Sequence, residues 1–362
     1  MRYPAEKSQR GLSIVELMVA LLLASLLTMG LVQIFVGNSK TFQLNEASAR
    51  VQESGRMASS ILSRAIRNAD YWGCSGAFDG ADGVDSMLKD PSDNDSDAFD
   101  TAAFLESFMV GLEGEHDVAD GNSFGALEGS DTVTFGGQEK NTGLNLTDHT
   151  PKTAAALATG EDSEDYFDVG DLMIISDCRS ANLLQVTGFQ NNGIVANKGG
   201  KTDPGNKTKQ QNDFQEGGEV FAPIQNKFYV QEQADGRRAL VVNARRNTSA
   251  TGTMGDWAGP DELVSGIRDL RIQFGRDTTG NNKVDTWSVP GPQSEAEEAI
   301  AVRFSLLVRS PESEVVEESQ SYCFPGWLDC QNDASLLTDA SDRHLYRVYT
   351  QSTSLRNRLG GK

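Results

Sequence analysis

The sequence is poor in the residues that most enzymes use for acid–base chemistry. It has three histidines, His116, His149 and His344, which lie far apart along the chain. It contains no GxSxG, HExxH or P-loop pattern. A zinc site is also disfavoured, because the four cysteines include no CxxC spacing. These absences indicate a protein that is not an enzyme.

Basic residues are scarce relative to acidic ones. The 362 residues include 32 lysines and arginines against 52 aspartates and glutamates, which gives a formal net charge of −20. Such a chain should repel nucleic acid and anionic lipid except where basic residues cluster, so no nucleic-acid partner is expected. The clusters, which suit acidic partners or are ordinary strand-edge charges, are Arg237 with Arg238, Arg245 with Arg246, and Arg343, Arg347, Arg356 and Arg358.

Only one apolar run is long enough to span a membrane. It extends from Leu12 to Val36, which is 36 − 12 + 1 = 25 residues, and roughly 20 are enough to cross the hydrocarbon core as a helix. Three basic residues precede the run and only Lys40 closely follows it. By the positive-inside rule, the short N-terminus is cytoplasmic and the rest of the chain is exported.

Glu16 is the only charged residue in this run. An acid at the centre of a spanning helix costs about 2.5 to 3.5 kcal/mol, and less near an end. A secretory signal peptide and an uncleaved anchor are the simplest interpretations of the run, but neither explains this acid. The run is also longer than a usual signal-peptide core, and the small residues at 47–49 lie too far beyond it for an ordinary cleavage site.

Cleavage between Gly11 and Leu12 would explain Glu16. The new α-amino group of Leu12 would be a cation about one helical turn from the carboxylate. In a stack of such helices, Glu16 of one chain would pair with the terminus of its neighbour, which offsets the cost of burial and sets the axial register.

The start of the chain, RGLSIVELMVALLLASLL, resembles the class III leader of type IV pilins and pseudopilins, with Leu12 where phenylalanine is commoner. The resemblance implies that prepilin peptidase cleaves after Gly11, that Leu12 becomes the N-methylated terminus, and that Glu16 serves assembly. It also implies a single-pass protein of the bacterial inner membrane with a periplasmic head. The helix would pack beside other minor pilins and the major pilin, at the base or the tip of a pilus.

Four segments are expected along the chain: a cleaved leader (1–11), a membrane-spanning or filament-core helix (12–36), its amphipathic continuation (37–70) and a β-rich head (71–362). The continuation has apolar residues at helical spacing, a Glu–Arg pair four residues apart and no proline. One unbroken helix is therefore expected over residues 12 to 68.

The head has the pattern of an antiparallel sheet. Short β-rich segments lie at 131–135, 171–176, 183–187, 227–231, 239–243, 267–274 and 300–308. The last alternates apolar and other residues as a strand with one buried face does. Segments 191–218 and 245–260 should be loops. A helix followed by antiparallel strands predicts an α+β fold.

Two acidic stretches could bind calcium, although no cofactor is expected. Residues 79–100 carry eight aspartates and should form a solvated acidic loop, whose DNDSD run lacks the glycine and glutamate of an EF-hand. The segment 277–285 is better explained as a hairpin turn between strands 267–274 and 284–289. The candidate calcium ligands are Asp93, Asp95, Asp97, Asp277 and Asp285.

The four cysteines are even in number and lie in the exported part, which is consistent with two disulfides. The favoured pairing joins Cys323 to Cys330, seven residues away, and Cys74 to Cys178. The other two connectivities stay open.

The head resembles the PilW family of minor type IV pilins. The motifs, which keep their order over nearly the whole chain, are YWGCSG at 71–76, GSDTVTF at 129–135, DLMIISDC at 171–178, LRIQFGRDTTGNNKVDTW at 270–287, VRFSLLVRS at 302–310 and LRNR at 355–358. The resemblance implies a structural subunit that joins other minor pilins and a tip adhesin to prime pilus assembly, in support of twitching motility and adhesion. Two alternatives stay open: a type II secretion minor pseudopilin of the J position, and a membrane-anchored periplasmic binding module.

Overall fold

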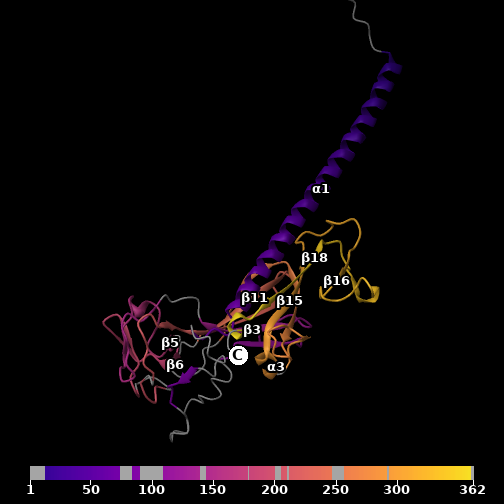
Figure 1. Ribbon diagram of the computed structural model, residues 1–362. Coiled ribbons are helices and arrows are strands. Elements are labelled where there is room, and N and C mark those ends of the chain that lie inside the picture. Colours follow the sequence, from indigo (N-terminus) through magenta and orange to yellow (C-terminus); the bar gives the residue numbers. More distant parts are fainter. Residues whose placement is uncertain are drawn as a thin grey trace, which may run out of the picture.

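One long helix projects from a β-rich head (Figure 1). The computed structural model describes residues 13–73, 84–89, 109–138, 144–177, 179–199, 205–209, 212–246, 257–291 and 293–359. Its elements confirm the expected α+β fold, in which a long N-terminal helix packs on antiparallel sheet.

Helix α1 (Ile14–Asn68) is unbroken for 55 residues, a length of about 82 Å at 1.5 Å per residue. The apolar run at its start is exposed: the large apolar side chains from Ile14 to Val36 are between 47% and 78% exposed. Its second half buries one face, at intervals of three or four residues. The buried residues are Ala47, Val51, Gly55, Ala58, Leu62, Ser63 and Ile66.

Two sheets and the second half of α1 form the main head, to which the described residues of 109–138 and 223–359 belong. One sheet has the strand order β12–β11–β10–β3–β2 and the other has the order β14–β13–β15–β18. The strands are β2 (Leu112–Glu115), β3 (Thr132–Gln138), β10 (Pro223–Glu232), β11 (Arg238–Arg246), β12 (Ala258–Ser265), β13 (Ile267–Arg276), β14 (Thr286–Ser288), β15 (Ala299–Arg309) and β18 (Tyr346–Ser354). All their pairings are antiparallel. The apolar face of α1 and the inner faces of both sheets share one core.

A second unit, the side lobe, comprises the described residues of 84–89 and 144–222. Its sheets have the orders β1–β6–β5–β9 and β4–β8–β7, and it has its own apolar core. Figure 1 shows β5 and β6 well away from α1. The strands are β1 (Val84–Ser86), β4 (Ala156–Leu157), β5 (Leu172–Asp177), β6 (Ser180–Gln185), β7 (Gly188–Gln190), β8 (Gly193–Val195) and β9 (Glu219–Phe221).

Small elements complete the chain. They are η3 (Ser163–Asp165), α3 (Gln293–Glu297), β16 (Ser321–Cys323), η4 (Ala334–Leu336), β17 (Leu337–Asp339) and η5 (Arg356–Arg358).

Several strands differ from the sequence prediction. β8 and the start of β12 lie inside the segments expected to be loops, and β18 was not expected at all. β12 is an exposed edge strand that contains Pro260, a residue tolerated at sheet edges but depleted inside sheets. β1 and β6 pair in parallel, which departs from the antiparallel pattern.

Candidate functional site

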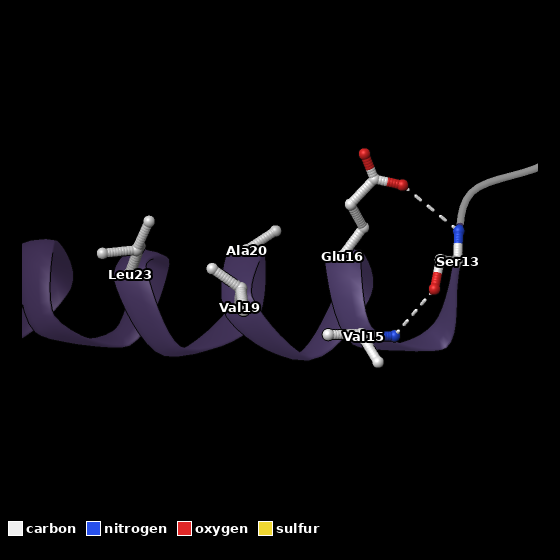
Figure 2. A pocket seen from close by; sticks show the side chains of 6 residues that line it. All are labelled: Ser13, Val15, Glu16, Val19, Ala20 and Leu23. Atoms are coloured by element: carbon white, nitrogen blue, oxygen red, sulfur yellow. Dashed lines mark hydrogen bonds between the residues drawn. The ribbon is translucent and has the colours of Figure 1, made fainter.

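Glu16 lies in the first turn of α1, where its carboxylate caps the helix. The Ser13 N–H donates to Glu16 Oε2 at 3.3 Å, and the Val15 N–H donates to Ser13 Oγ at 3.3 Å (Figure 2). This reciprocal arrangement is a capping box, which satisfies two backbone N–H groups that the helix leaves free. Ser13-Ile14-Val15-Glu16 is the S-x-x-E pattern of such a box, so the sequence contained this signal and our interpretation of Glu16 missed it.

The surroundings of the Glu16 carboxylate are apolar and exposed. Val15, Val19 and Leu23 lie on the same stretch of helix surface (Figure 2) and are 67%, 53% and 55% exposed. Only Oε2 of Glu16 takes part in a hydrogen bond with the described residues, so Oε1 has none within them. The site can therefore accept a bond from a cation on a neighbouring chain without giving up the cap. Gly11 and Leu12, the two residues of the expected cleavage site, lie outside the described residues.

The helix is suited to a membrane or to a bundle of similar helices. Within the described ranges, α1 is the one helix that is long and apolar enough to cross a membrane, and the most apolar part of it has no residue buried in the chain. Charged residues pair with the head only beyond the apolar run: Lys40 lies 3.9 Å from Glu317, and Arg50 lies 3.6 Å from Glu312. The free and the docked halves thus form one continuous rod.

The LRNR motif ties the end of α1 to the head. The Arg358 Nε donates to Asp70 Oδ2 at 2.6 Å, and the side chains of these two residues are 12% and 8% exposed. The same guanidinium donates to the carbonyls of Ala296, Glu297 and Ala299. Asp70 therefore fixes the chain where it leaves the helix.

A disulfide joins Cys323 to Cys330, with sulfur atoms 1.98 Å apart and Cα atoms 6.0 Å apart. It closes a short loop beside β15, where the Gly326 N–H donates to Ser305 Oγ at 3.0 Å. Cys74 and Cys178, the second expected pair, lie outside the described residues.

Two of the candidate calcium ligands are engaged as hairpin residues. Asp277 accepts hydrogen bonds from the backbone N–H groups of Thr279, Gly280 and Asn282. Asp285 accepts hydrogen bonds from the N–H and from the hydroxyl of Thr279, and these bonds stabilise the same turn between β13 and β14. Over the described ranges, no group of three or more His, Cys, Asp or Glu residues is arranged to hold a metal ion. Asp93, Asp95 and Asp97 lie outside the described residues. The expected solvated loop at 79–100 is wrong for residues 84–89, which contain β1 and bury Val84, Met87 and Leu88 in the side lobe.

Two of the three histidines have structural partners. His116 Nδ1 lies 2.7 Å from the buried Asp131 Oδ1, and His344 Nδ1 lies 2.8 Å from the Ser310 carbonyl. Neither contact involves a hydroxyl or thiol that could act as a nucleophile. His149 is exposed on the side lobe.

Several basic clusters from the sequence are paired within the chain. Arg237 lies 2.6 Å from Asp235, and Arg238 lies 3.1 Å from Glu232. Arg343 forms an ion pair with Glu314, and Arg245 and Arg246 also have partners. Arg347 and Arg356 are exposed.

Part of the main head is similar to a known protein family. Residues 227–357 match the PilW family, described as type IV pilus-assembly protein W. With the exposed apolar helix, this match supports a type IV pilus-related pilin. The resemblance seen in the sequence is therefore confirmed, but over 131 residues (357 − 227 + 1) rather than nearly the whole chain. The first three motifs, at 71–76, 129–135 and 171–178, lie outside the match.

One solved structure with a likeness to this chain is a type IV-like pilin from Thermus thermophilus. The two chains are 13% identical, the alignment covers 54% of this chain and 90% of that one, and the TM-score is 0.24. At that score the folds do not superpose closely, so no contact is transferred between them. No curated protein matches the sequence.

Proposed function

We propose that this protein is a minor type IV pilin, a non-catalytic subunit that joins other minor pilins and a tip adhesin to prime pilus assembly. In that role it would support twitching motility and adhesion. The observation that carries the proposal is the structure of α1: an exposed apolar half with a capped acid near its start, continuous with a half that is docked on the head. The PilW match in the head supports the same role.

The proposed role implies a sequence of assembly steps. The helix inserts in the inner membrane with the N-terminus cytoplasmic and the head periplasmic. Prepilin peptidase removes residues 1–11 and Leu12 is N-methylated. The exposed half of α1 then packs beside the helices of other minor pilins and of the major pilin, and Glu16 accepts a hydrogen bond from the α-amino group of a neighbouring chain. One oxygen of the carboxylate keeps the Ser13 cap while the other meets the neighbour.

Processing is tested by intact mass. We expect the membrane-extracted protein to begin at methylated Leu12, and Gly11→Ala to leave the longer form. A mature protein that begins near Ser48, or a functional protein that retains residues 1–11, would contradict the proposal.

The charge of Glu16 is tested separately from its cap. Glutamine can occupy the third position of a capping box, so Glu16→Gln keeps the cap and removes the charge. Ser13→Ala is the matched control, because it removes the serine half of the cap and keeps the charge. We expect Glu16→Gln to abolish recovery with partner pilins and piliation, and Ser13→Ala to retain both. Wild-type piliation with Glu16→Gln would reduce Glu16 to a capping residue.

A further inference from the structure

Three arginines from three strands converge beside α1. Arg238 begins β11, Arg268 is the second residue of β13 and Arg309 ends β15. They line a cleft of about 460 Å³ between the main head and the second half of the helix. Its charged lining residues, which we call the arginine cleft, are Arg50, Glu53, Arg237, Arg238, Arg268 and Arg309. Five arginines and one glutamate thus line the cleft, and four of the arginines (Arg50, Arg237, Arg238 and Arg309) also form ion pairs with acids.

Gly266 holds this convergence in place. Its N–H donates to the Arg238 carbonyl at 2.9 Å, and its own carbonyl accepts from the Arg309 N–H at 2.9 Å. Its φ of +83° favours glycine, and a Cβ there would lie 3.0 Å from the Arg309 carbonyl oxygen. Gly266 therefore joins the backbones of Arg238 and Arg309, and a residue with a side chain would not fit easily in its place.

A β-bulge at Arg268 directs this arginine toward the cleft. The pairing of β13 with β15 shifts register between Ile267 and Asp269, so Arg268 has no direct partner across the ladder. Such bulges redirect a side chain and recur beside functional sites. The Arg238 guanidinium also donates to the Arg268 carbonyl at 3.4 Å, which brings the two residues into contact.

Of these three arginines, Arg268 is the one without a salt bridge among the described residues, although the charge of Glu232 acts on it. Arg238 pairs with Glu232 at 3.1 Å and Arg309 with Asp342 at 3.4 Å. In the part of the chain that the structure describes, Arg268 makes no side-chain hydrogen bond or ion pair. Burial, followed by the charges of Arg238 and Arg309, lowers the pKa of the Arg268 guanidinium. A half-buried cation among like charges is stabilised when an anion enters the site.

We propose that the arginine cleft binds an acidic peptide segment of a neighbouring subunit, with a carboxylate on the Arg268 guanidinium. The choice of a neighbouring subunit rests on the proposed function. Guanidinium groups bind carboxylates through two parallel hydrogen bonds. The cleft also presents apolar surface from Met57, Leu263 and Pro311, which suits a peptide better than a bare ion.

The position along α1 argues against a lipid headgroup. Arg50, the lining residue nearest the apolar run, lies 50 − 36 = 14 residues after Val36, or about 21 Å along the helix. The polar region of a bilayer leaflet is only about 5 to 8 Å thick. A neighbouring head, packed beside the same helix, reaches this height.

Fluorescence anisotropy of a labelled hexaglutamate peptide, with full-length protein in detergent, tests the proposal. Hexaglutamine is the uncharged control peptide. We expect the wild type to bind only hexaglutamate and Arg268→Gln to bind it at least about tenfold more weakly, since a hydrogen bond to a charged group is lost. Arg268→Lys keeps the positive charge but loses the two parallel donors of the guanidinium, so its affinity for hexaglutamate should lie between those of the wild type and Arg268→Gln.

Arg56→Gln is the matched control, because Arg56 lies exposed on the same helix beside a different groove. It should bind hexaglutamate within about twofold of the wild type, as a surface charge acts weakly. Equal loss in both variants, or no loss with Arg268→Gln, overturns the proposal. The proposal is also overturned if inorganic phosphate raises the melting temperature of the protein while hexaglutamate fails to bind. A lower melting temperature of Arg268→Gln would overturn it as well, because Arg268 would then be a structural residue.

Intact mass of the same preparation separates this inference from the proposed function. A methylated Leu12 with unchanged binding in Arg268→Gln defeats the cleft proposal alone. Retained residues 1–11 with binding that depends on Arg268 defeat the pilin role and keep the acidic-peptide site.

Discussion

Arg358→Ala should destabilise the junction between α1 and the main head more than any exposed substitution in the same turn. Arg358 and Asp70 are 12% and 8% exposed and their nearest atoms are 2.6 Å apart. Removal of the guanidinium leaves the Asp70 carboxylate buried without its cation. It also leaves the carbonyls of Glu297 and Ala299 without their donor. Breaking a buried pair in this way costs about 3 to 5 kcal/mol.

The free energy of unfolding can be followed locally, because Trp72 Nε1 donates to Asp70 Oδ1 at 2.7 Å. The melting temperature, measured by tryptophan fluorescence during thermal unfolding in detergent, should be roughly 6 to 20 °C lower for Arg358→Ala than for the wild type. Arg356→Ala, an exposed change in the same 3₁₀ turn, should cost less than about 0.5 kcal/mol.

A double-mutant cycle with Asp70→Ala isolates the pair itself. The two changes together should cost less than the sum of the two single changes, since each single change leaves one buried partner uncompensated. A loss below about 1 kcal/mol for Arg358→Ala, or strict additivity in the cycle, would refute the reasoning.

Two further predictions concern the main head. Burial raises the pKa of the Tyr229 hydroxyl to about 12, whereas an unfolded tyrosine ionises near pH 10. Because the unfolded state loses its proton first, the stability of the folded state should fall as pH rises from about 10 to 12. The melting temperature, measured against pH, should fall less steeply in Tyr229→Phe than in the wild type. Gly55→Ala should destabilise the docking of α1, because its Cβ would lie 2.2 to 2.5 Å from the Tyr349 ring; in a Tyr349→Ala background the same change should instead stabilise by up to about 1 kcal/mol, from helix propensity.

The controls for these two predictions are simple. An unchanged alkaline slope in Tyr229→Phe would mean that other tyrosines carry the effect. Gly37→Ala is the control for Gly55→Ala, since a Cβ at Gly37 meets no atom within 4 Å. If Gly55→Ala raises the melting temperature in the wild-type background, the Tyr349 contact does not limit the packing of α1.

Local patterns in the sequence predicted the elements that depend on local physics. The helix expected over residues 12–68 is α1 (Ile14–Asn68), because its apolar run, its spacing and the absence of proline act within a few turns. The alternating segment 300–308 is β15, and the expected hairpin is the pair of β13 and β14.

Features that depend on distant partners were not visible in the sequence. β18 is rich in polar residues, and it forms a strand because β15 pairs with it along its whole length and α1 packs on it. Asp70 and Arg358 are 288 residues apart. Arg268 becomes part of a site only through a bulge in the register of two strands. The S-x-x-E pattern of the cap at Ser13 was visible in the sequence, but Glu16 was interpreted only as a partner for the terminus of a neighbouring chain.

The path of the chain between β3 and β10 has a consequence for how this protein can diverge. The polypeptide leaves the five-stranded sheet at β3 and returns to it at β10, the adjoining strand, whose pairing extends from Pro223 opposite Gln138 to Phe228 opposite Val133. The ladder is thus complete whatever is spliced between its two ends. The segment between β3 and β10 can therefore change in length without a change in this register, whereas β1, which enters the side lobe from an earlier part of the chain, pairs with β6 and depends on it.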